Sequence, residues 1–350
     1  MTIRQNGGLG AGTNAGGTHG RALRLVLLVQ FILLLFCLSL ALGSVDIPFR
    51  HVVDILLGRE VNNASWRFIV LETRLPQAVT ALLAGGALAV SGLLLQTAFR
   101  NPLAAPDIFG ITSGASLAVA LLMLAPGLAA AGTLGYLSSV GAAFVGAVAV
   151  TALIWLCSRL VRNSVVLIII GIMTGYLCSS AITLLNFMAT EEGVRSFVVW
   201  GMGDFSNVSL AAMPVFATLT VAGTSGTLLL AKPLNALLLG PQYAGSLGIN
   251  VRRTRNVLLL LTGLLTAVVT AFCGPIAFIA LAVPHVARLW LHTSDHRQLL
   301  PATILLGAAV ALLCNVLTTL PAGGVVLPLN AVTPLIGAPV IIYVILRKPA

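Results

Sequence analysis

Long apolar runs, for example residues 75–98 and 164–188, constrain the fold of this chain more than any other feature of its sequence. An α-helix needs about 20 mostly apolar residues to cross a hydrocarbon core of roughly 30 Å. The strands of an outer-membrane barrel would instead alternate apolar and polar residues in pieces of about 10, whereas these runs are continuous. Hydrophobic residues make up 58% of the chain and charged residues 8%, unlike a soluble domain. The sequence therefore predicts an all-α integral membrane protein.

The apolar runs divide into ten predicted spans: 23–43, 75–98, 103–125, 135–157, 164–188, 209–231, 257–275, 276–291, 299–320 and 329–346. With both termini in the cytoplasm, most Lys and Arg residues fall on the cytoplasmic side, as the positive-inside rule requires. The basic residues left outside are Arg50, Arg59, Arg67, Arg74 and Arg195. The basic residues of loops that face anionic lipid therefore account for the net charge of +10. We expect no nucleic-acid partner, because these residues are scattered and form no basic stripe.

The chain divides into a short tail and one membrane domain. Residues 1–20 are rich in Gly, Thr and Asn and predict a disordered cytoplasmic tail, while residues 21–350 form the ten-helix domain. The five cysteines show no C-x-x-C spacing, so we expect free thiols and no metal site.

The sequence carries little chemistry of its own. The predicted spans hold almost no ionisable residues, and both lysines are followed by proline, so the G-x-x-x-x-G-K-[ST] phosphate loop is missing. We therefore predict a transport subunit that is not an enzyme and binds no cofactor, with energy supplied by a different chain. The alternative is an ion-coupled secondary transporter or channel, whose only support is Gly and Pro breaks such as Gly274-Pro275.

The longest predicted cytoplasmic connection, residues 232–256, contains two apolar segments. They predict two short helices joined at Gly240 and Pro241 and ended at Gly248. Apolar residues in a cytoplasmic loop require a covering surface, which is either a partner protein or the lipid headgroups.

Five motifs in order resemble the FecCD-type permeases, the membrane subunits of type II ABC importers for ferric siderophores, haem and cobalamin. They are "TRLPQAVTALLAGGALAVSGLLLQTAFRNPLAAPDIFGITSGA" at 73–115, "WGMGDF" at 200–205, "LLLGPQYAGSLGINVRR" at 237–253, "GPIAFIALAVPHVARL" at 274–289 and "LIGAPVIIYVIL" at 335–346. The resemblance covers roughly residues 25–350 and implies the ten-helix permease fold of that family.

The resemblance also implies partners. These are a second permease copy or a paralogous permease around a central lumen, ABC ATPase subunits that carry ATP and Mg, and a periplasmic or lipid-anchored binding protein. It places the chain in the bacterial inner membrane. The implied ATPase contacts are Leu239, Gly240, Ala244, Leu247 and Gly248. Pro241 departs from the family pattern, which has an acidic residue there.

Three further sets of residues follow from the resemblance. The binding protein is expected to dock on Arg74 first, and on Arg59, Arg67 and Arg195. The cytoplasmic gate is expected at Asn163 and Ser164, and the lumen wall at Thr174, Ser179, Thr183 and Asn186. In "RNPLAAPDIFG", a family turn, we expect Asn101 to cap the turn and Asp107 to pair with Arg100 or to cap the next helix. At two positions this chain departs from the family pattern: Ala280 replaces the usual glycine, and Asn315 stands where many members carry an acidic residue. Neither departure argues against the resemblance.

Overall fold

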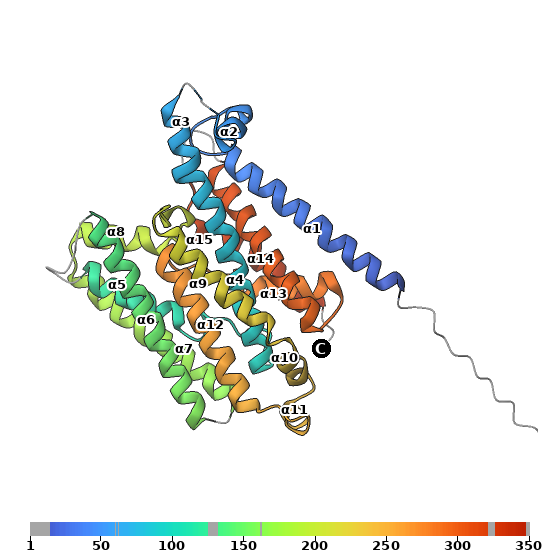
Figure 1. Cartoon of the computed structure of the whole chain (residues 1–350). Coiled ribbons are helices and arrows are strands. Elements are labelled where there is room, and N and C mark those ends of the chain that lie inside the picture. The colour runs from blue at the N-terminus through green and yellow to red at the C-terminus, as the bar shows by residue number, and fades with distance from the viewer. Residues whose placement is uncertain are drawn as a thin grey trace, which may run out of the picture.

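The computed structural model describes residues 15–59, 61, 63–124, 132–161, 163–320 and 326–347, and every regular element in that part of the chain is helical (Figure 1). The elements in chain order are α1 (Ala15–Ala41), α2 (Phe49–Leu56), α3 (Ala64–Phe68), η1 (Ile69–Arg74), α4 (Leu75–Phe99), α5 (Ile111–Leu124), α6 (Gly132–Leu160), α7 (Ser164–Met188), α8 (Glu191–Gly201), η2 (Phe205–Asn207), α9 (Met213–Leu228), α10 (Ala231–Leu238), α11 (Pro241–Ser246), α12 (Val251–Cys273), α13 (Ile279–Leu291), α14 (His296–Thr319) and α15 (Leu329–Arg347).

Each predicted span corresponds to one helix. Within the described residues, six helical segments are long and apolar enough to cross a membrane, and α9 meets the same test only together with α10, from which it bends by 51°. The shorter apolar helices α5, α13 and α15 supply the other three predicted spans. The all-helical, multi-pass fold expected from the sequence is therefore confirmed.

Several boundaries differ from the prediction, each for a local reason. α1 begins at Ala15, so part of the predicted tail 1–20 is helical, and residues 1–14 lie outside the described part. α5 begins at Ile111 instead of 103, because the segment before it, with Pro102 and Pro106, folds as turns. α12 begins at Val251 instead of 257, because the Asn250 side chain accepts a hydrogen bond from Arg253 N and caps the helix there.

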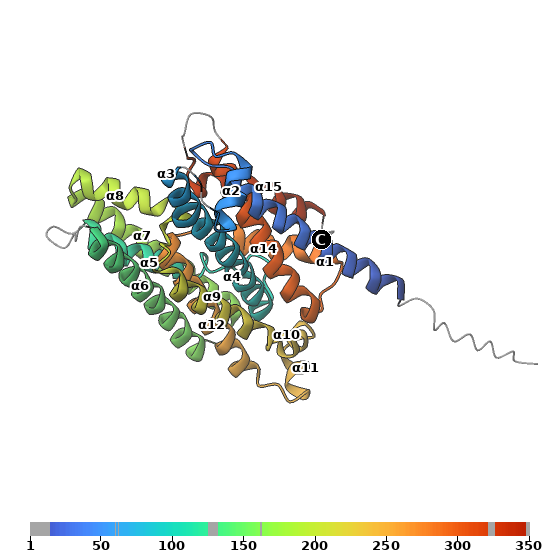
Figure 2. The same cartoon turned by 45° about the horizontal axis from the view of Figure 1, so that its top comes forward.

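The centre of the bundle is α4, whose sides contact α14, α12, α13 and α9 (Figures 1 and 2). Small residues permit these close crossings, as is usual between membrane helices. A Cβ atom placed on Gly85 would lie 2.3 Å from Gly307 O, and one on Gly92 would lie 1.7 Å from Ala280 O. At these two crossings the helix backbones themselves are in contact, so no side chain fits between them.

A second layer of helices lies beside the central one. α5, α6 and α7 pack against each other, and α12 joins them to α4 through its contacts with α5 and α6. α7 has the least covered span in the described chain, with 17% of its residues buried inside the protein. A large face of α7 is therefore available to lipid or to another chain.

The two ends of the bundle differ. α10 and α11 lie together at one end, here called the coupling end, while α2, α3 and α8 lie at the opposite end, here called the crown end (Figure 1). α1 lies on the outside of the bundle beside α14, inclined to it (Figures 1 and 2). The candidate sites described next lie at these two ends and on α7.

Candidate coupling surface, transport path and crown cavity

α10 and α11 form the paired short helices that the sequence predicts at 232–256. Gly240 joins them with φ of +105°, and Gly248 ends the second with φ of +79°, conformations that side chains rarely adopt. Ala244 N donates to Gly240 O at 2.9 Å, and Ile249 N donates to Ala244 O at 3.1 Å. The first of these bonds begins α11 and the second closes its last turn.

The exposed residues of this pair form one apolar ridge, which we call the coupling ridge. Leu239, Tyr243 and Leu247 are spaced by four residues, and their side chains are 63%, 55% and 56% exposed. Tyr243 and Leu247 are four residues apart and share one face of α11, whereas Leu239 is the exposed residue that ends α10 just before the joint at Gly240. Large apolar side chains exposed together at the end of the bundle mark a surface that another protein or a lipid covers.

The structure divides the predicted ATPase contacts into two groups. Leu239, Leu247 and Gly248 are exposed and available to a partner. Gly240 and Ala244 are buried, and Ala244 has no exposed surface at all, so these two shape the ridge and do not contact a partner. Tyr243 was not in the predicted set, although its spacing of four from both leucines could have identified it.

Asn235 connects the coupling helices to two spans. Its Oδ1 accepts hydrogen bonds from His296 N at 2.7 Å and from His296 Nδ1 at 2.9 Å, and its Nδ2 donates to Asp295 Oδ1 at 2.6 Å. His296 Nε2 lies 2.9 Å from Thr97 Oγ1 at the end of α4. The buried His296 therefore joins α10, α14 and α4 through side-chain hydrogen bonds.

Asp295 caps α14 with its carboxylate. The carboxylate accepts hydrogen bonds from Arg297 N at 3.0 Å and from the Asn235 amide. These two bonds, in that order of size, lower the pKa of Asp295 below its ordinary value. The negative charge also lies at the positive end of the α14 dipole.

The turn "RNPLAAPDIFG" lies beside the coupling helices. Arg100 adopts a left-handed φ of 49° at the end of α4, and Asn101 Oδ1 accepts from Leu103 N at 2.9 Å, as predicted for the cap. His285 Nε2 shares a hydrogen bond of 2.8 Å with Pro102 O, which connects α13 to the turn. A Cβ atom on Gly240 would lie 3.8 Å from Arg100 Nη1, so the turn and the coupling helices are neighbours.

Asp107 lies just before α5 and does not pair with Arg100. The Thr112 hydroxyl bonds to its carboxylate in the first turn of α5. Burial raises the pKa of Asp107 to about 6, and the Thr112 bond opposes this shift. Among the described residues the only ion pair within 4.0 Å joins Arg59 and Asp54.

The predicted gate lies at the first turn of α7. The Asn163 side chain caps this helix by accepting from Val165 N at 2.9 Å. Ser164 is the first residue of α7, and its side chain lies outside the described part.

The predicted lumen residues share one helix but not one face. Ser179, Thr183 and Asn186 follow the spacing i, i+4, i+7 and lie on one side of α7, whereas Thr174 is turned by about 140° from Ser179. The hydroxyls of Thr174 and Thr183 donate to Ile170 O and Ser179 O of α7 itself. These four residues are exposed or half-buried, so the face with Ser179 is open to a second chain.

Arg74, the first docking candidate, is an internal residue. Its side chain is 4% exposed, and its guanidinium donates to Leu40 O at 2.9 Å, to Ala41 O at 2.8 Å and to Val45 O. These carbonyls lie at and just beyond the end of α1, where helix carbonyls lack partners. Arg74 therefore holds the end of α1 against α4, and the docking prediction for it is corrected.

The other predicted docking arginines are exposed at the crown end. Arg59 pairs with Asp54 at 3.0 Å, and Arg67 lies on the short helix α3. Arg195 lies on α8 and faces a cavity of about 1100 Å³. These three remain available to a partner.

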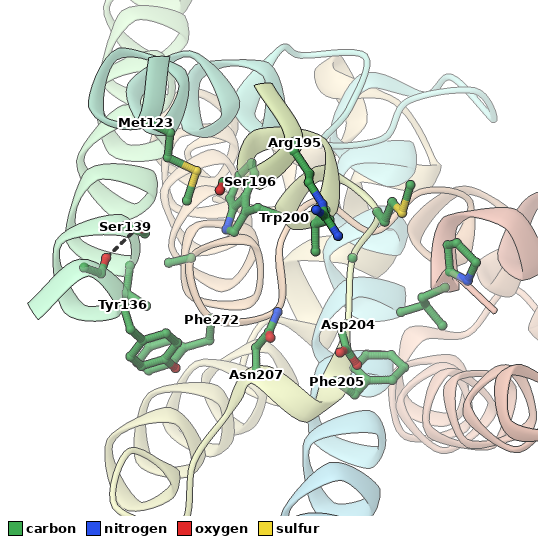
Figure 3. Close-up of a pocket in the computed structure, with 18 of the residues that line it drawn as sticks. Met123, Tyr136, Ser139, Arg195, Ser196, Trp200, Asp204, Phe205, Asn207 and Phe272 are labelled. Atoms are coloured by element: carbon green, nitrogen blue, oxygen red, sulfur yellow. Dashed lines mark hydrogen bonds between the residues drawn. The ribbon is translucent and has the colours of Figure 1, made fainter. Parts of the chain in front are cut away.

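This cavity, the crown cavity, is shown in Figure 3. Aromatic residues from four elements line it (Figure 3). They are Tyr136 of α6, Trp200 of α8, Phe205 of η2 and Phe272 of α12, and Asp204 and Asn207 add polar groups. Its volume matches the upper range of small-molecule sites in proteins. The described residues contain no group of three His, Cys, Asp or Glu side chains that could hold a metal ion.

The multi-pass helical fold and the paired helices α10 and α11 define a helical membrane permease. The model of the FecCD transport family matches residues 31–347, and the chain therefore belongs to that family of membrane permease components of ABC transporters. The resemblance and the permease fold predicted from the sequence are thus confirmed.

Two curated relatives and one solved structure extend this result. The hemin transport system permease protein HmuU of Yersinia pestis is 34% identical over 334 residues, 94% of this chain and 98% of that protein. The vitamin B12 import system permease protein BtuC of Salmonella paratyphi A is 33% identical over 294 residues, 82% of this chain and 86% of that protein. A structure described as a metal-chelate type ABC transporter in an inward-facing conformation matches with a TM-score of 0.79 at 28% identity, covering 93% of this chain and 99% of that chain.

Proposed function

We propose that this chain is the permease of an ABC importer that carries a large metal chelate into the cytoplasm across the bacterial inner membrane. The candidate cargoes are a ferric siderophore, haem and cobalamin. Similarity to a hemin permease and to a vitamin B12 permease at nearly equal identity supports this class of cargo.

The coupling ridge carries the proposal. It presents Leu239, Tyr243 and Leu247 at one end of the bundle, and Asn235 connects the same helices to α14 and α4 through hydrogen bonds. A separate ATPase subunit, which holds ATP and Mg, would seat against the ridge. Its movement would then be transmitted to the spans by a short hydrogen-bonded path. In this orientation the coupling end and both termini face the cytoplasm.

A second copy of this chain, or a paralogous permease, completes the transport path in this proposal. The uncovered face of α7, with Ser179, Thr183 and Asn186, would line the lumen between the copies, and Asn163 with Ser164 would narrow it on the cytoplasmic side. Weakly polar groups suit the passage of a bulky chelate, since a tightly held cargo would not leave.

A soluble or lipid-anchored binding protein would deliver cargo to the crown end. Its acidic residues would face Arg195, Arg67 and Arg59, three exposed arginines of that end. Exposed ion pairs contribute about 0.2–1 kcal/mol each, so we expect docking to depend on several of them together.

Uptake into liposomes tests the proposed function. The permease, its ATPase and its binding protein are reconstituted, and ferric siderophore, haem and cobalamin are offered in parallel. We expect one cargo to accumulate only with ATP. Gly240→Val is the matched loss-of-function variant, because a β-branched residue is strained at φ of +105° and would distort the joint between α10 and α11. Uptake driven by an ion gradient without the ATPase would establish the secondary-transporter alternative instead.

A further inference from the structure

A narrow apolar groove lies between α1 and α14 near the coupling end. Its volume is about 370 Å³. α1 contributes Arg24, Leu27, Leu28 and Phe31, and α14 contributes Leu306, Ala309, Val310 and Leu313. Both sets follow the spacing i, i+3, i+4, i+7, so two facing helix stripes form the walls. Each stripe is about 10 Å long at 1.5 Å per residue.

α1 is anchored at both ends of this groove, to α14 toward the crown end and to α13 toward the coupling end. Toward the crown end, Asn315 Nδ2 donates to Ser39 Oγ at 2.8 Å, and Gln77 Nε2 donates to Asn315 Oδ1 at 2.9 Å. Toward the coupling end, Arg24 Nη1 donates to Trp290 O at 2.6 Å. The groove is therefore a defined space between anchored helices, and α1 is held at a fixed distance from α14.

Among the residues whose side chains the structure describes, Arg24 is the one charged residue that lines the groove. A guanidinium has five N–H donors, and one of those of Arg24 bonds to Trp290 O within the described part of the chain. Trp290 lies two residues before His292, at the end of α13 that leads to the Asp295 and Asn235 contact. An Arg and a Trp at this level are the side chains that membrane proteins place at the headgroup layer.

We propose that this groove binds one anionic glycerophospholipid from the leaflet at the coupling end. One acyl chain lies between the two stripes, and the phosphate accepts hydrogen bonds from Arg24. The surrounding medium supplies the occupant, because an apolar groove open to the membrane meets acyl chains and no water. That this leaflet is the inner one rests on the proposed function. The groove and its test do not depend on the proposed function.

The groove explains how α1 stays attached. α1 is 28% buried over its span and contacts mainly α14. A lipid in the groove would contact both stripes at once and would add the packing that the protein itself does not supply. We therefore expect this lipid to remain bound after purification in mild detergent.

Fluorescence quenching of Trp290 tests the proposal on the permease alone. The probe is a variant in which Trp66, Trp155 and Trp200 are replaced by phenylalanine, placed in vesicles that contain dibrominated phosphatidylglycerol or dibrominated phosphatidylcholine. A single cation near the surface favours anionic lipid by about fivefold in relative affinity. We expect the quenching curves of the parent protein to show this preference for phosphatidylglycerol over phosphatidylcholine. We expect Arg24→Gln to remove the preference.

The controls separate the groove from general attraction to anionic lipid. Arg253→Gln removes an exposed arginine at the coupling end and should leave the preference unchanged. Leu27→Asn changes an exposed wall residue and should weaken quenching by both lipids. Equal quenching by both lipids in the parent protein, or an unchanged preference in Arg24→Gln, would overturn the proposal. No quenching of Trp290 by either lipid would also overturn it, because a bound acyl chain would then be absent from the groove.

Discussion

Replacing Asn235 by alanine should separate ATP hydrolysis from transport. The substitution removes the charge-assisted bond to Asp295 and leaves His296 N and Nδ1 without their acceptor. A bond to a charged group contributes about 1.5–3 kcal/mol, and an unpaired buried donor costs about 1–3 kcal/mol. Since these effects overlap in one network, we expect a net loss of about 2–4 kcal/mol in the attachment of α10 to α14 and α4.

The assay measures cargo transported per ATP hydrolysed in proteoliposomes. Because 1.4 kcal/mol corresponds to a factor of ten, we expect Asn235→Ala to lower this ratio at least tenfold while the ATPase remains bound. Asn256→Ala is the matched control, since that side chain accepts one long bond of 3.2 Å from Ser158 Oγ. If Asn235→Ala transports as much cargo per ATP as Asn256→Ala, the hydrogen-bonded path does not transmit the motion.

Three further predictions concern stability. Arg74→Gln should destabilise the protein by about 2–4 kcal/mol, because three carbonyls at the end of α1 lose a charged donor, and thermal unfolding in detergent measures this. Gly92→Ala should lower the free energy of unfolding by about 3 kcal/mol, because its Cβ would overpack against Ala280 O. Gly141→Ala is the control and should not destabilise the protein, because the space around its Cβ position is open. Equal melting temperatures of the two variants would contradict the close crossing. Asp295 has a lowered folded pKa, so its contribution is present above its unfolded pKa of about 4 and is lost as the pH falls further. Asp295→Asn should therefore reduce the dependence of the melting temperature on pH below about 5, and an unchanged profile would argue against this cap.

Features that depend on local sequence could be predicted. The ten apolar helices follow from run length, and the two coupling helices follow from glycines that end them at 240 and 248. The helix starts were less accurate, because the choice between Asn250 as a cap and a later start depends on hydrogen bonds that composition does not reveal.

Features that depend on contacts between distant segments could not be predicted. Arg74 has the same sequence setting whether it anchors a headgroup, docks a partner or binds the carbonyls of α1, and only packing distinguishes these roles. The contact between Asn235 and His296 joins residues 61 positions apart. The burial of Ala244 likewise follows from how α11 lies against the bundle.

The most direct test of the central claim is whether the coupling ridge holds the ATPase. Co-purification of the ATPase is compared for Leu239→Asp, Leu247→Asp and the matched variants Leu239→Met and Leu247→Met. Methionine keeps the volume and the apolar surface, whereas aspartate places a charge in a contact that would exclude water. We predict that the methionine variants retain the ATPase and that the aspartate variants lose it. Full retention of the ATPase by both aspartate variants would show that it docks elsewhere.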